Sequence, residues 1–133
     1  MPQEVTVSVG EQPYTTAVTI GPHQIVADEP GELGGHDEGP APTSLLLASI
    51  ATCKVITAKM YAARKGWPVE RIDATARAAA VAGHVISRVE VELTVVGDLT
   101  DEQRQRVLEI AEKCPVQKAV STGIVVASTL AAG

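Results

Sequence analysis

Alternating apolar and polar residues predict strands in the first part of the chain. Residues 4–9 place a valine at every second position, a period of two that is typical of a half-buried strand. The alternation returns over residues 14–20 and again over residues 23–28, with Gly and Pro in the turns between them. We therefore expect an N-terminal β-meander.

A long loop follows these strands. Residues 29–42 read EPGELGGHDEGPAP, and so many Gly and Pro residues exclude a regular element. Loops of this length inside a compact domain are often functional. His36 and Asp37 are therefore candidate groups near a site, although a solvated loop tip is the preferred explanation for both.

Residues 43–65 form the clearest predicted helix. Thr43 or Ser44 is suited to cap its start, and Gly66 followed by Pro68 ends it. Steps of three and four residues place one apolar stripe on the helix, made of Leu46, Ile50, Cys53, Thr57 and Met60.

The second half of the chain predicts two more strands, a helix, a helical turn and a last strand. Thr100 begins the helix with a capping-box pattern to Gln103, and Val107, Leu108 and Ala111 form its inner stripe. The other predicted elements are strands at 69–80 and 85–96, a helical turn ending at Ser121, and a strand at 123–130. The order βββ–α–ββ–α–β indicates an α+β fold, and residues 1–133 are expected to form a single domain.

Composition and charge narrow the class of protein. Of the 133 residues, 45% are hydrophobic and 20% are charged, which is typical of a globular chain. The net charge of −5 argues against nucleic acid or an anionic membrane as a partner. Residues 1–10 lack a basic segment, and the longest apolar run, 45–51, is too short to span a bilayer. We expect a cytoplasmic protein.

The core must be built from small side chains. Phe is absent, and the aromatic residues are Tyr14, Tyr61 and Trp67. Ala and Val side chains bury less apolar area than Phe or Leu. Burial of further surface between two copies compensates for this, so we expect a homodimer.

The two cysteines are the candidate chemistry. Cys53 and Cys114 do not have the spacing of a zinc site, and no metal or cofactor is expected. They are either two inert thiols or a redox pair. Cys114 precedes Pro115 and is placed to cap a helix, where free N–H groups favour a thiolate. Lys54 follows Cys53, but the helical step turns it away from the Cys53 face.

Three segments resemble one family. They are GGHDEGPAPTSLLLASIATC at 34–53, MYAARKGWP at 60–68 and GDLTDEQRQRVLEIAEKCPV at 97–116. Together with the order of elements, they resemble the OsmC/Ohr family of osmotically inducible and organic hydroperoxide resistance proteins, in a divergent branch. The resemblance implies an OsmC-like fold, in which antiparallel sheets pack on two cysteine-bearing helices within an intertwined homodimer.

The resemblance also implies a thiol peroxidase that reduces organic hydroperoxides in oxidative stress defence. By position, Cys53 would be the peroxidatic thiol and Cys114 the resolving thiol. An external dithiol, such as a lipoyl group, would restore both. The family's supporting Glu falls at Thr43, and its supporting Arg has no counterpart, because residues 1–53 contain no basic residue.

Other interpretations remain open. If the chain is a peroxidase, the cation that lowers the pKa of Cys53 would come from Arg88, Lys118 or a partner subunit. A non-peroxidase relative would instead bind a small apolar or sulfur-bearing ligand at the dimer interface, a use that fits a site without Arg and Glu. Two thiols that merely pack in the core are the third alternative.

Overall fold

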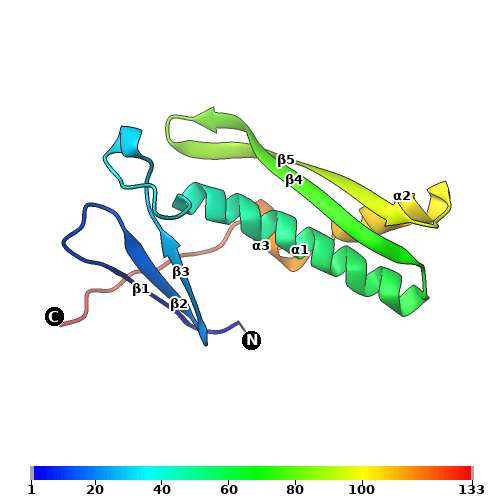
Figure 1. Ribbon diagram of the computed structural model, residues 1–133, viewed down its shortest axis with the longest axis horizontal. Helices are drawn as coiled ribbons and strands as arrows, with labels where there is room; N and C mark the ends of the chain where they lie inside the picture. The colour runs from blue at the N-terminus through cyan, green and yellow to red at the C-terminus, as the bar shows by residue number, and fades with distance from the viewer. Residues whose placement is uncertain (1, 133) are drawn as a thin grey trace. The chain divides into compact units, whose positions relative to one another are not determined.

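The computed structural model describes residues 2–132 as an α+β chain (Figure 1). Contacts divide it into two compact units, one up to Leu46 and one from Leu47, which are described separately. The elements are β1 (Val5–Val9), β2 (Thr16–Ile20), β3 (His23–Ala27), a 3-10 turn (Gly31–Leu33), α1 (Pro42–Lys65), β4 (Val69–Ala82), β5 (Val85–Gly97), α2 (Asp101–Ala111) and α3 (Pro115–Thr122). The predicted α+β class is confirmed, while the single domain stays a prediction.

The first unit holds the predicted meander. Strands β1, β2 and β3 pair antiparallel in sequence order, with Val7 opposite Val18 and Val18 opposite Ile25. Val18 is buried, whereas the side chains of β1 are exposed throughout.

A buried carboxylate organises the loop that follows β3. Asp28 is 2% exposed and accepts hydrogen bonds from Thr15 Oγ1 at 2.9 Å, the Glu29 N–H at 2.7 Å and the Glu38 N–H at 3.3 Å. Gly39 lies against the backbone of Val26, where a Cβ atom would collide with a carbonyl. The loop is therefore fixed by its own hydrogen bonds although it has little regular structure.

Helix α1 begins at Pro42, one residue before the predicted start, because Pro is suited to the first helical position. Its buried residues are Ile50, Lys54, Ala58 and Ala62, which recur at steps of four. The predicted apolar stripe is wrong in part, since Leu46 is 40% and Met60 63% exposed. The buried face instead runs from Ile50 and Lys54 to the small side chains of Ala58 and Ala62.

The second unit packs this small-residue face of α1 against α2 and the β4–β5 hairpin. Ala58, Val107 and Ala111 are fully buried in one cluster, and partly buried apolar residues cover it: Trp67, Ile72, Leu93 and Val95. Strands β4 and β5 pair antiparallel, with Ala74 opposite Leu93 and Ile72 opposite Val95. Alternate residues of β5 thus face the core, as the sequence pattern predicted.

Helix α2 has the predicted start, and its buried face differs by one residue from the prediction. Thr100 accepts the Gln103 N–H, and Gln103 Oε1 accepts the Thr100 N–H, which completes the capping box. Val107 and Ala111 are buried as predicted, but Leu108 is 38% exposed.

The strand predicted at 123–130 is absent from the described chain. Residues 123–132 are extended without a ladder partner, and Val125 and Leu130 are 97% and 100% exposed. Alternation and β-branched residues favour extended backbone, but a strand forms only where another strand accepts its hydrogen bonds.

Helix α1 also passes a simple test for a membrane span. Its 24 residues contain a window of mean hydropathy 1.4, so length and composition alone would allow it to cross a bilayer. The prediction from the short run 45–51 overlooked this, because it counted only uninterrupted apolar residues. Such a helix is weak evidence of a span, since core helices of soluble proteins have the same composition.

We predict that Asp28→Asn destabilises the first unit in a pH-dependent way. Burial raises the pKa of Asp28, but hydrogen bonds from Glu29, Thr15, Glu38 and His36 outweigh it, so the pKa lies below its ordinary value. A lowered pKa adds stability above the unfolded-state pKa of about 4, and this stability is lost as pH falls through the folded-state pKa.

Hydrogen exchange of the Glu29 and Glu38 amides should therefore accelerate in the variant at pH 7. The difference from the unchanged protein should shrink when both are measured below pH ~4. Equal protection of these amides in both proteins at pH 7 would contradict the prediction.

Candidate functional site

The two cysteines meet in the second unit. Cys53 lies in the middle of α1 and is half-buried, while Cys114 is fully buried at the start of α3. The Cys53 thiol is near enough to raise the pKa of the Cys114 thiol, and it lies 4.0 Å from Thr57 Oγ1. Residues 61 positions apart in sequence thus form one pair of thiols.

Cys114 caps α3 with its sulfur, as predicted. Its Sγ accepts the Gln117 N–H at 3.3 Å, and Pro115 occupies the first turn. Serine, threonine or aspartate usually fills this position, because a side-chain acceptor satisfies an otherwise unpaired N–H group. Here a thiol takes that place.

The pKa of the Cys114 thiol is raised overall. Burial is the largest cause, and the Cys53 thiol adds to it; the Gln117 N–H and the charge of Lys54 act in the opposite direction. The expectation that capping alone would favour the thiolate is therefore wrong, because desolvation of a fully buried sulfur outweighs one N–H group.

Lys54 is the functional residue that the sequence interpretation missed. Its side chain is 4% exposed, and its Nζ lies 3.0 Å from Glu112 Oε1. Glu112 Oε2 in turn accepts Gln117 Nε2 at 3.0 Å. Lys54 was expected to point away from the site, yet it lies on the buried face of α1. The spacing of Ile50, Lys54 and Ala58 was the signal that would have found it.

Gln117 belongs to the same cluster. Besides its backbone N–H, which reaches Cys114, its Nε2 reaches Glu112. Its Oε1 is buried, and no donor among the described residues reaches it. This oxygen is therefore an unsatisfied acceptor in the interior of the second unit.

The other candidate groups lie elsewhere. Arg88 is exposed on β5 and pairs with Glu90 Oε2 at 3.0 Å, and Lys118 is exposed on α3. His36 and Asp37 belong to the loop of the first unit, where the Asp37 N–H donates to the Glu29 carbonyl. Among the described residues, no contact joins Arg88, His36 or Asp37 to either cysteine, and Lys118 meets Cys114 through its backbone N–H, which donates to the Cys114 carbonyl at 3.1 Å.

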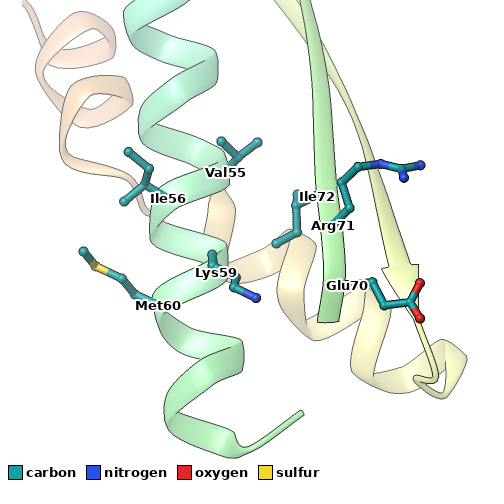
Figure 2. Close-up of a pocket in the computed structure, with 7 residues that line it drawn as sticks. All are labelled: Val55, Ile56, Lys59, Met60, Glu70, Arg71 and Ile72. Atoms are coloured by element: carbon teal, nitrogen blue, oxygen red, sulfur yellow. The ribbon is translucent and has the colours of Figure 1, made fainter. Parts of the chain in front are cut away.

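A separate open groove of about 460 Å³ lies between α1 and β4. Figure 2 shows Val55 and Lys59 reaching from α1 toward the strand, where Ile72 points back toward the helix. Ile56 and Met60 also line the groove, although their side chains point away from β4, and Glu70 and Arg71 point away from α1. The lining is mostly apolar, and neither cysteine takes part in it.

The family is shown by a match over most of the chain. Residues 35–129 match the family model of OsmC-like proteins. The chain belongs to the OsmC-like family. Both cysteines, Lys54 and Gln117 lie inside the matched region. None of the curated proteins matches the sequence.

Solved structures of OsmC-like proteins have the same fold. An OsmC-like protein from Mycoplasma pneumoniae is 15% identical with a TM-score of 0.74, and 91% of this chain covers 88% of that one. The organic hydroperoxide resistance protein OhrB of Bacillus subtilis is 22% identical with a TM-score of 0.60, and 90% of each chain is covered.

A third structure, an organic hydroperoxide resistance protein OsmC from Legionella pneumophila, is 20% identical with a TM-score of 0.66. It covers 90% of this chain and 89% of its own. At these identities the likeness establishes the OsmC-like fold.

We predict that alkylation distinguishes the two thiols of the OsmC-like chain. Iodoacetamide should modify half-buried Cys53 at least about tenfold faster than fully buried Cys114, because access and a raised pKa both protect Cys114. Peptide mapping of the reduced native protein at several times measures this ratio. The two rates should become equal in denaturant, and faster modification of Cys114 in the native protein would refute the prediction.

Proposed function

We propose that this OsmC-like protein is a thiol peroxidase that reduces organic hydroperoxides, with Cys53 peroxidatic and Cys114 resolving. The observation that carries the proposal is that the two free thiols lie in one folded unit, Cys53 in the middle of α1 and Cys114 as the cap of α3. The partial exposure of Cys53 supports its role as the first thiol, because a substrate can reach it.

The first step oxidises Cys53. Its thiolate attacks one oxygen of the hydroperoxide, the O–O bond breaks, and the alkoxide takes up a proton and leaves as an alcohol. Cys53 thereby loses two electrons and becomes a sulfenic acid.

The second step closes a disulfide. Cys114 attacks the Cys53 sulfur, the S–O bond breaks, and hydroxide leaves and becomes water. An external dithiol, for which a lipoyl group has the right chemistry, then reduces the disulfide by exchange and is itself oxidised. Such dithiols are maintained in a reducing cytoplasm, which is where we place the protein.

Ligand binding without peroxide chemistry is the second candidate function. The groove between α1 and β4 favours it, because Val55, Ile56, Met60 and Ile72 provide an apolar lining. A small apolar ligand would fit that lining. The two functions are distinguishable, because the groove is not lined by either cysteine.

We further propose that the protein acts as a homodimer. Large apolar side chains are exposed on α1 and on the extended tail, at Ile56, Met60, Val125 and Leu130. A chain whose core is built from Ala and Val has most to gain by covering them with a second copy.

We predict that one equivalent of tert-butyl hydroperoxide removes two hydrogens from the reduced protein and links Cys53 to Cys114. Intact mass and peptide mapping measure this. Cys53→Ser should abolish peroxide consumption, because it removes the attacking sulfur. Cys114→Ser should permit the first oxidation but stop at the sulfenic acid, which dimedone traps on Cys53.

The denatured protein is the control for thiol reactivity that does not depend on the fold. If the native protein oxidises no faster than the denatured one, the thiols have no special reactivity and the peroxidase proposal fails. Equal partial losses in both variants would point instead to damaged packing.

We predict that sedimentation at micromolar concentration gives a dimer. Val125→Asp together with Leu130→Asp should shift it toward the monomer, because charges in the tail oppose burial of this segment. Gln105→Asp, on the exposed side of α2, is a matched control that should remain dimeric. A monomer in the unchanged protein would contradict the prediction.

A further inference from the structure

The burial of Lys54 is not explained by the stability of the folded protein, because an apolar side chain would be less costly to bury at this position. Its side chain is 4% exposed on the buried face of α1, one turn before fully buried Ala58. Burial of an ammonium group costs more free energy than burial of an apolar side chain of the same length, even when a carboxylate is paired with it. Its partner Glu112 is 55% exposed, so the desolvated charge of this pair is the cation.

The cation is placed on the Cys114 side of the thiol pair. Lys54 Nζ binds Glu112 Oε1 at 3.0 Å, Glu112 Oε2 binds Gln117 Nε2 at 3.0 Å, and the Gln117 N–H binds Cys114 Sγ at 3.3 Å. The chain of contacts thus runs from Lys54 to Cys114. Two groups of this chain favour the Cys114 thiolate, the Gln117 N–H and the Lys54 charge, and they act against the burial of the sulfur.

We propose that Lys54 is a positioning residue for disulfide closure, whose buried ammonium stabilises the Cys114 thiolate that attacks the oxidised Cys53 sulfur. This inference rests on the proposed peroxidase function. In the step, the Cys114 sulfur supplies the electron pair of the new S–S bond, and the S–O bond of the sulfenic acid breaks. The hydroxide that leaves combines with the proton released by Cys114, and Lys54 itself gives up neither electrons nor a proton.

The need for such a cation follows from the burial of Cys114. A fully buried thiol favours its neutral form, and the neutral form is a poor nucleophile. Among the described residues, Cys53 and Lys54 are the ionisable groups whose charges act directly on Cys114, and only Lys54 favours the thiolate. Glu112 opposes Lys54, because its negative charge offsets part of the ammonium's effect.

This electrostatic role predicts opposite effects for two neighbouring substitutions. Lys54→Met removes the cation and should raise the Cys114 pKa by about one unit, which slows disulfide closure about tenfold at neutral pH. Glu112→Gln keeps the shape of the side chain but removes its charge, so it should lower the Cys114 pKa and speed closure. A purely structural role would slow closure in both variants.

The experiment separates the two oxidation steps. Reduced protein is mixed rapidly with tert-butyl hydroperoxide, dimedone-trapped Cys53 measures the first step, and the loss of two hydrogens measures closure across a pH series. We expect Lys54→Met to leave the first step within about twofold and to move the pH midpoint of closure upward by about one unit. Lys54→Arg should restore closure, and Lys113→Met, which removes an exposed cation next to Cys114 in sequence, should leave closure unchanged.

A second measurement keeps the inference testable without a peroxide. In a Cys53→Ser background, the ultraviolet absorbance of the Cys114 thiolate is titrated against pH. Lys54→Met should move the titration upward and Glu112→Gln downward. Shifts in the same direction, or none in either variant, would overturn the role of Lys54. Failure of the wild-type Cys53 to oxidise would overturn the peroxidase proposal instead, and the titration would still report on Lys54.

Discussion

The close contact of small side chains between α1 and α2 determines where the chemistry of this chain lies. Ala58 packs with Val107 and Ala111 in a fully buried cluster. Because these side chains are short, the two helix backbones can approach closely. Lys54 lies one turn before Ala58, and Cys114 follows Ala111 by three residues. The same contact therefore brings the ammonium and both thiols together at one end of the helix pair.

Local patterns predicted most of the fold. The meander, the two strands β4 and β5, the Thr100 capping box and the Cys114 cap depend on residues near one another in sequence, so short-range rules found them. Two other features depend on contacts with residues that are distant in sequence. The buried face of α1 follows Ala58 and Ala62 because α2 must come close, and the tail 123–132 stays unpaired because no strand of the described chain lies beside it.

The candidate site, too, was predicted in part and missed in part. The pairing of Cys53 with Cys114 was anticipated from the family resemblance, since nothing in a sequence alone joins residues so far apart. Lys54 was missed because apolar periodicity assigns a lysine to the solvent side of a helix. Its ion pair with Glu112 overrides that rule and holds a buried ammonium group on this face of α1. Both cysteines and this cation lie in the same unit of the OsmC-like fold.

The most direct test of this arrangement is a redox titration of the native protein against buffers of reduced and oxidised dithiothreitol. The fraction of protein with a Cys53–Cys114 disulfide is read by mass after the thiols are trapped. A preformed pair gives one two-electron transition, with a slope of about 30 mV per tenfold change in the ratio of oxidised to reduced protein. Absence of an intramolecular disulfide at every potential, or links only between chains, would show that the two thiols do not act together.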